Sequence, residues 1–399
     1  MKNILLLTNI YPNNDPDYGG TSVCHFFTQE WVKLGYNVRV IHFDSLFPRP
    51  YYWVGKMFNS VLQARTGCVI YTKTPRLPKK YNVDDVPVMF VPLRKIIPHK
   101  QFSDKTMQKA MEYVVYELET EKFVPDIIVG HFILPQLQFL HLFKQKYPRV
   151  TSCMVLHSSK EMKAVYPNNW QEYMASVDIW GFRSVAFKEK FESVYGVQPR
   201  EFLCYSGIPE KYLDCPKKEF KKEIKKFAFV GSLYELKRVN DTINALYIAF
   251  PNKDFSFDIV GSGAEESNLK SLVKKLGLKD QVIFHGQQKR DDAQKIMGKA
   301  DCFVMVSTHE AFGLVYVEAM ARGLITIATR GQGIDGIIID GENGYLCESR
   351  NPQALAQVIK RIRSLSVEEL NKISEAAIKT AENLTNKKVA ENYIKAISQ

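Results

Sequence analysis

The sequence has no long hydrophobic run. Its apolar stretches stay well short of the roughly 18 residues that a membrane-spanning helix needs. The N-terminal run at Ile4–Leu7 is also much shorter than the hydrophobic core of a secretory signal peptide. These absences argue against a transmembrane or secreted protein. They predict a cytoplasmic one, with contact at the inner face of the cell membrane left open.

Cysteine is scarce and follows no pattern. The seven cysteines are scattered, odd in number and never spaced as C-x-x-C, so neither a zinc site nor a disulfide framework is indicated. Simple repeats and low-complexity segments are missing as well, which argues against collagen-like, coiled-coil and disordered classes. We expect reduced thiols and no metal site.

The composition is that of a folded, basic protein. Hydrophobic residues make up 45% of the 399 residues, and at roughly 150 residues per domain this length predicts two or three domains. The 54 Lys and Arg residues exceed the 43 Asp and Glu residues, which gives a formal net charge of +11. Such an excess suggests an anionic partner: a nucleotide, a nucleic acid or an acidic membrane surface.

Short apolar runs alternate with helix-length stretches through the first half of the chain. Near-continuous apolar runs of this kind are typical of parallel strands that are buried on both faces. The runs are Asn3–Asn9, Asn37–Asp44, Asp126–Ile133, Thr151–Ser158 and Glu201–Tyr205. A helical pattern at Val23–Leu34 follows the first of them, as in the opening of a nucleotide-binding α/β unit.

The amino-acid composition changes between Cys204 and Lys226, where Gly and Pro residues precede the basic run KKEFKKEIKK. We therefore expect the domain linker there. The alternation then restarts with a second set of runs: Phe227–Gly231, Phe255–Val260, Val282–Gly286, Asp301–Ser307 and Leu324–Thr329. Two series predict two Rossmann-like, doubly wound α/β domains that face a cleft. We place them at 1–208 and 209–384, with a C-terminal helix at about 385–399 that can pack back on the first domain.

The most informative stretch is Ser307–Arg322, STHEAFGLVYVEAMAR. We expect Glu310 in a loop at the carboxyl end of a strand and Glu318 on a helix that Gly313 opens. The backbone N–H groups of that first turn would be a ready anion site for a diphosphate. They belong to Gly313, Leu314 and Val315. The plain alternative is a loop glutamate followed by a solvated helical glutamate.

These residues carry a resemblance. The segment EAFGLVYVEAMARG is similar to the signature E-G-F-G-L-x-x-x-E-A-M-A-x-G of retaining glycosyltransferases of the GT-B fold, family 4, also called glycosyl transferases group 1. Ala311 stands where that family usually has its first glycine. The resemblance implies a GT-B architecture and glycosyl transfer from a nucleotide-diphosphate sugar with retention, without metal or cofactor. The donor base is left open among UDP, GDP and ADP.

A second match is VGSLYELKRV at Val230–Val239. The family usually reads G-R-L-x-x-x-K here, and its two basic residues bind the donor phosphates. This sequence keeps the lysine as Lys237 but has Ser232 in place of the arginine. Either Arg238 supplies the missing positive charge, or the site relies on Lys237 and the helix terminus alone. By the same resemblance Gln288, after a later strand, lies near the nucleobase.

In the expected first domain, Gly19 and Gly20 form a turn between the first strand and helix, where backbone can approach a phosphate or sugar closely. The resemblance places this loop near the diphosphate and the acceptor, and it matches His131 to a histidine near the donor sugar. Because a lone histidine is more often a satisfied structural group, both interpretations of His131 stay open. His157 is an acceptor-side candidate. The triplet Asp15–Asp17 reads D-x-D but precedes a glycine turn, so we interpret it as a solvated turn rather than a metal site.

The segment Phe47–Arg65 interleaves aromatic residues with Arg49, Lys56 and Arg65. Buried, it is an ordinary helix; exposed, it is an amphipathic element that can lie on an anionic membrane. Because family members with lipid-linked acceptors dock through their first domain, the resemblance allows a glycan or lipid-linked acceptor and a role in surface polysaccharide or glycolipid synthesis.

The expected function is hexosyl transfer. Lys237 and the amides that begin at Gly313 would stabilise the leaving diphosphate, Glu310 would hold the sugar and Glu318 the ribose, and His131 would contact the sugar. A GT-B sugar-nucleotide epimerase and a non-catalytic nucleotide-sugar binding protein are the alternatives. A nucleic-acid partner is not expected, because no aromatic single-strand platform or reading helix is present.

Overall fold

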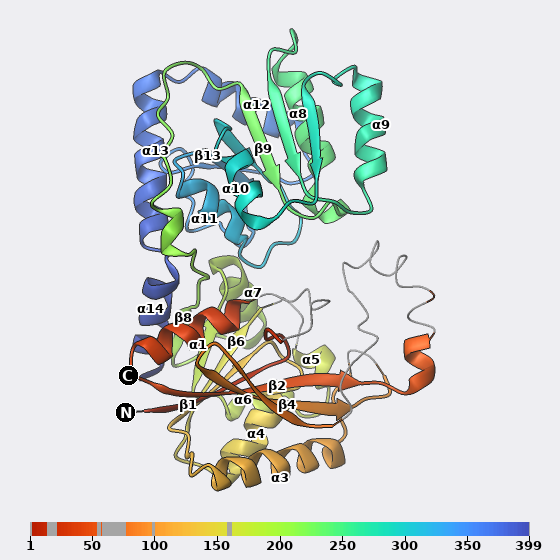
Figure 1. Ribbon diagram of the computed structural model, residues 1–399, viewed down its shortest axis with the longest axis vertical. Helices are drawn as coiled ribbons and strands as arrows, with labels where there is room; N and C mark the ends of the chain where they lie inside the picture. Colours follow the sequence, from red (N-terminus) through yellow and green to blue (C-terminus); the bar gives the residue numbers. More distant parts are fainter. Residues whose placement is uncertain are drawn as a thin grey trace.

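The computed structural model describes residues 2–13, 22–53, 57, 77–97, 100–157 and 162–398. These residues form two α/β lobes, one above the other in Figure 1. No helix among them is long and apolar enough to cross a bilayer.

The first lobe is built on a sheet that, in the described residues, has eight strands in the order β3-β4-β2-β1-β5-β6-β7-β8. All neighbours pair in parallel except β3 with β4. The strands are β1 (Asn3–Thr8), β2 (Asn37–Leu46), β3 (Lys79–Val83), β4 (Val86–Arg94), β5 (Ile127–His131), β6 (Thr151–Leu156), β7 (Ile179–Phe182) and β8 (Glu201–Leu203).

Helices cover both faces of this sheet, which is why its central strands β1, β5 and β6 are buried and mainly apolar. On one side α1 (Val23–Lys33) lies against the sheet; on the other lie α3 (Asp104–Thr120) and α4 (Gln136–Lys146). The shorter helices are α5 (Met162–Val165), α6 (Trp170–Ala175) and α7 (Val185–Tyr195).

The second lobe has, within the described chain, a parallel sheet of six strands in the order β11-β10-β9-β12-β13-β14. The strands are β9 (Lys226–Val230), β10 (Ser256–Val260), β11 (Val282–Gly286), β12 (Cys302–Val304), β13 (Ile325–Thr329) and β14 (Tyr345–Cys347). The helices are α8 (Val239–Ala249), α9 (Glu266–Leu276), α10 (Arg290–Met297), α11 (Leu314–Met320), α12 (Pro352–Arg363) and α13 (Val367–Glu382). The short 3₁₀ turns η1 (Glu210–Tyr212) and η2 (Glu235–Lys237) precede β9 and α8.

The last helix, α14 (Asn386–Ser398), returns to the first lobe and packs on α1 (Figure 1). The Trp31 indole N–H donates to the Ala390 carbonyl at 3.2 Å. The Tyr393 ring lies edge-on to the rings of Phe27 and Trp31, with centroids 5.1 and 5.0 Å apart. Burial of these large aromatic rings ties the end of the chain to its beginning.

The prediction of two Rossmann-like domains is confirmed. Each expected apolar run contains a strand, but four further strands have no counterpart in the sequence analysis. Strand β3, KKYNV, is a polar edge strand, and two prolines interrupt β4, so neither reads as a buried parallel strand. Strands β7 and β14 have only four and three residues, too few to show a period.

The loops at the carboxyl ends of the two sheets touch each other. Tyr205 follows β8, and its ring lies 5.6 Å from the ring of Phe312, in the loop that leads to α11. Val185, at the start of α7, packs so closely on Gly336 that an added Cβ there would meet it at 2.8 Å. The predicted domain boundary at 208/209 falls between β8 and β9. Both sheets thus direct their carboxyl edges, where open α/β folds bind ligands, to one region.

Candidate functional site

Lys237 and Glu310 are paired at the carboxyl edge of the second sheet. The Lys237 ammonium lies 2.5 Å from a Glu310 carboxylate oxygen, and both side chains are mostly buried. The Thr308 N–H donates to the Leu236 carbonyl at 2.9 Å, which ties the two loops together directly beside the pair. The structure therefore joins the cation of one sequence motif to the first carboxylate of the other.

Close backbone packing fixes the loop that carries Lys237. A Cβ added to Gly261 would lie 1.9 Å from the Gly231 carbonyl oxygen, and one added to Gly263 would lie 2.4 Å from that of Leu233. Such contacts admit only glycine. The G-x-G after β10 is thus explained by the approach of two loops at the edge of the sheet.

Gly313 begins α11 in the left-handed conformation, with φ of 80°. An added Cβ would clash with the Tyr316 ring at 2.4 Å, so glycine is required here. The N–H groups of Gly313, Leu314 and Val315 have no acceptor among the described residues. Free amides next to the Lys237 loop are suited to hold an anion, as the sequence predicts.

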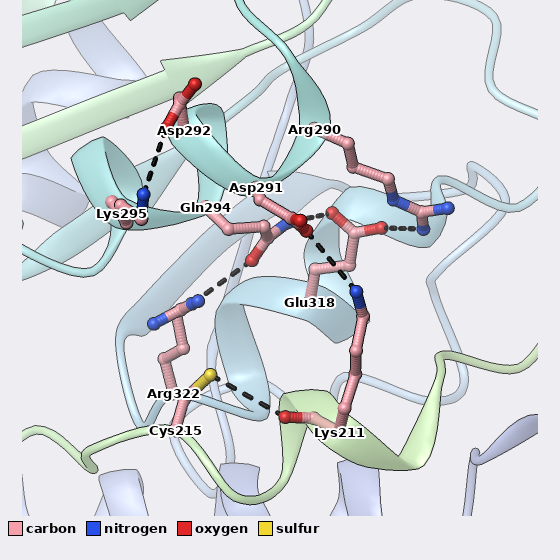
Figure 2. Close-up of polar contacts among 9 residues, drawn as sticks. All are labelled: Lys211, Cys215, Arg290, Asp291, Asp292, Gln294, Lys295, Glu318 and Arg322. Carbon is pink, nitrogen blue, oxygen red and sulfur yellow. Dashed lines mark hydrogen bonds and ion pairs between the residues drawn. The ribbon is translucent and has the colours of Figure 1, made fainter.

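Glu318 is buried one turn into α11 and is not free (Figure 2). Arg290, the first residue of α10, donates to one carboxylate oxygen at 2.6 Å, and Gln294 donates to the other. The Arg322 Nε–H in turn donates to the Gln294 carbonyl oxygen at 3.1 Å, which orients the amide. Burial raises the pKa of the Glu318 carboxyl, whereas Arg290 opposes that rise. Any partner of Glu318 must use the lone pairs that these bonds leave.

Arg238 is already paired with an acidic side chain. Its guanidinium makes two hydrogen bonds to the buried Asp241 carboxylate, at 2.9 and 3.0 Å. Ser232, where the family has an arginine, is exposed. Asp241 already neutralises Arg238. This ion pair argues against the prediction that Arg238 replaces the missing arginine.

His131 needs a correction. The resemblance matches it to a histidine near the donor sugar, but the side chain is fully buried, as in a structural histidine. Its ring nitrogens are both occupied: Nδ1 lies 2.8 Å from His157 Nε2, and Nε2 lies 3.1 Å from the Tyr393 hydroxyl. Burial lowers the pKa of His131 to about 3, so the ring is neutral and fixes the half-buried His157 instead of meeting a ligand. The packing of α14 buries His131, and no pattern of neighbouring residues predicts that packing.

The remaining predicted residues are placed as follows. Gln288 follows β11, and its amide N–H donates to the His285 carbonyl at 2.6 Å. Gly19, Gly20 and Asp15–Asp17 lie outside the described residues, as does most of Phe47–Arg65. Among the residues that are described, no three His, Cys, Asp or Glu side chains are grouped as metal ligands.

Arg290 and Gln294 are missed by the sequence analysis, although they hold Glu318. Both lie on α10, which carries no family signature, and their contact with α11 depends on how the two helices pack. The only sequence signal is their spacing of four, which puts them on one face of a helix.

Residues 213–380 match the model of the family "Glycosyl transferases group 1", so the second lobe carries a domain of that kind. The chain is 33% identical over 166 residues to the N-acetyl-alpha-D-glucosaminyl L-malate synthase of Bacillus anthracis, covering 41% of this chain and 42% of that protein. It is 36% identical over 104 residues to the lipopolysaccharide core biosynthesis glycosyltransferase LpsE of Rhizobium meliloti, covering 26% and 30%. The chain thus spans less than half the length of these relatives.

The whole chain superimposes on HepE of Anabaena, which was crystallised with UDP. The TM-score is 0.69, the sequence identity 16%, and both chains are covered completely. At this identity the likeness establishes the fold, which is GT-B.

Proposed function

We propose that the protein is a retaining glycosyltransferase that moves a hexose-type sugar from a nucleotide-diphosphate sugar to a glycan or lipid-linked acceptor. The observation that carries the proposal is the Lys237–Glu310 pair beside the free amides that begin at Gly313. A cation, unsatisfied N–H groups and a carboxylate then surround one point of the sheet edge. This combination suits a diphosphate joined to a polyhydroxylated sugar. The matching family model and the UDP-bound structural relative support it.

In the proposed reaction Lys237 and the first-turn amides stabilise the negative charge that develops as the diphosphate leaves. Glu310 accepts hydrogen bonds from the sugar hydroxyls, and Glu318 accepts them from the ribose. The leaving phosphate oxygen takes the proton of the acceptor hydroxyl, on the face from which the phosphate departs. His131 is buried, so it orients His157, which is the histidine that we assign to the sugar side.

The direct test is ligand binding without a divalent metal. We expect UDP-, GDP- or ADP-sugar to raise the melting temperature in the presence of EDTA, because Lys237 and the amides replace a metal ion. At a ligand concentration 100 times the Kd the stabilisation is about 2.7 kcal/mol, which a thermal-shift assay resolves. Failure of all three donor classes to stabilise the protein, with or without Mg²⁺, would contradict the proposed site.

The first lobe has features that suit a lipid-linked acceptor at a membrane. A groove of about 640 Å³ lies at the carboxyl ends of β2 and β4. Of the described residues that line it, the apolar ones are Leu46, Phe47, Pro48, Leu77, Ile96, Ile97 and Phe102, and the charged ones are Arg94, Lys95 and Lys100. The described lining combines apolar side chains with cations and contains no carboxylate, which suits an anionic amphiphile. We propose that this face contacts an anionic membrane.

Ile96→Glu tests this membrane contact. Ile96 is 81% exposed at the groove, and burying an isoleucine in lipid is worth roughly 1.5–3 kcal/mol. We expect the variant to bind phosphatidylglycerol vesicles about tenfold more weakly in a sedimentation assay. Val197→Glu is the matched control, since Val197 is 75% exposed beyond α7 and lines no part of the groove. Equal losses in both variants, or none in either, would contradict the assignment.

A further inference from the structure

Arg183 is a buried cation that pairs with no acidic side chain of the described residues. It follows β7 at the carboxyl edge of the first sheet and is only 3% exposed. Its guanidinium donates to the Cys204 carbonyl at 2.7 Å and to the Ser206 hydroxyl. These acceptors are neutral, and Arg183 forms no ion pair within 4.0 Å among the described residues. Burying an unpaired charge is costly, and neutral acceptors compensate only part of that cost.

The positive charge lies against the donor loop of the other lobe. The centre of the Arg183 guanidinium is 5.4 Å from the centroid of the Phe312 ring. Phe312 directly precedes Gly313, so the cation contacts the residue that is next in the chain to the free amides at the start of α11. The first turn of the neighbouring helix α7 holds no acidic residue.

The positive charge of Arg183 affects two nearby histidines. After burial, Arg183 is the main cause that lowers the pKa of His131, and it lowers that of His157 as well. Both rings are therefore held neutral, and they neither add to nor offset the charge of Arg183. An anion that enters beside Phe312 would supply the missing negative charge.

Of the two basic residues in the motif at Val230–Val239, Lys237 alone is left for the proposed diphosphate site. Ser232 is uncharged, and Asp241 neutralises Arg238, so Lys237 is left with Glu310 as its own partner. We propose that Arg183, from the first lobe, is the second cation of the donor diphosphate site. It acts across the Phe312 ring rather than by contact with the phosphates. This inference rests on the proposed donor site at Lys237 and Gly313.

The mechanism is long-range attraction through a water-excluded contact. Two unit charges about 10 Å apart at an effective dielectric constant near 20 still interact strongly enough to change an affinity by about tenfold. Because Arg183 is buried, salt screens this attraction little. The contribution depends on the charge of the ligand, so it acts on a nucleoside diphosphate and not on the nucleoside.

The experiment compares Arg183→Gln with Arg183→Lys in the full chain. Both keep an N–H donor for the Cys204 carbonyl, but only lysine keeps the charge. For whichever of UDP, GDP and ADP the wild type binds, we expect calorimetry to show about tenfold weaker binding by Arg183→Gln. Binding by Arg183→Lys should stay within about twofold of wild type. The matching nucleoside should bind all three proteins equally.

Arg363→Gln is the matched control. Arg363 also donates to a backbone carbonyl, that of Ala249 at 2.8 Å, and stacks on a phenylalanine ring, Phe250, at 4.0 Å. It lies where α8 ends, at the amino edge of the second sheet, so we expect unchanged nucleotide affinity. The inference is overturned if Arg183→Gln binds the diphosphate like wild type. It is equally overturned if Arg183→Lys binds the diphosphate as weakly as Arg183→Gln does. It is also overturned if Arg183→Gln loses as much affinity for the nucleoside as for the nucleoside diphosphate. Absence of diphosphate binding by the wild type would instead refute the proposed function.

Discussion

Lys237→Ala is expected to reduce the rate of glycosyl transfer by about 100- to 1000-fold, the usual loss when one preorganised donor to a developing anion is removed. The ammonium is held at 2.5 Å from Glu310, on a loop fixed by close glycine contacts, and therefore costs no reorganisation as the diphosphate leaves. Glu310→Ala should have a similar effect, because the sugar loses its acceptor and Lys237 its orientation. Turnover with the true donor and acceptor is the measurement, with circular dichroism to check the fold.

The exchange variant Lys237→Glu/Glu310→Lys separates chemistry from packing. It restores an ion pair between the same two loops, so we expect a melting temperature closer to wild type than that of either alanine variant. Activity should stay lost, since the exchange moves the cation from η2 to the loop before α11. Near wild-type turnover by both alanine variants would contradict the site. Recovery of activity by the exchange would show that the pair serves only the fold.

Glu318→Ala is expected to weaken nucleotide binding by about 10- to 100-fold, because hydrogen bonds to a charged acceptor are worth about 1.5–3 kcal/mol each. Arg290 and Gln294 each bind a different carboxylate oxygen, and every such oxygen can accept a second hydrogen bond. The ribose hydroxyls can thus bind without displacing either partner. Calorimetry with the nucleoside diphosphate that the wild type binds provides the measurement.

A nucleotide without ribose hydroxyls supplies the control for Glu318. The wild type should bind the 2′,3′-dideoxy nucleoside diphosphate as weakly as Glu318→Ala binds the normal one, and Glu318→Ala should not distinguish the two ligands. Gln294→Leu offers a second comparison, because it removes one partner of the carboxylate but keeps the carboxylate itself. An unchanged affinity of Glu318→Ala, or an equal loss for both ligands, would count against the ribose role.

Several features of the site are local enough to be predicted from the sequence. The strand that leads to Lys237, the glycine that opens α11 and the position of Glu318 on that helix all follow from short patterns. A parallel strand that is buried on both faces is mainly apolar, and the left-handed residue that opens α11 must lack a Cβ because the Tyr316 ring lies against it. Such constraints act between neighbours in the chain, so a short stretch of sequence is enough to predict them.

The sequence by itself determined two series of βα units and the two motifs that end their strands at a common edge, because strand and helix patterns are set by neighbouring residues. Only the tertiary structure decided the pairing of charges. Asp241 pairs with Arg238, Tyr393 of α14 covers His131, and Arg183 lies beside Phe312 with no carboxylate partner in the part of the chain that the structure describes. Whether a charge is paired, buried or available depends on side chains distant in sequence, and only packing brings those together.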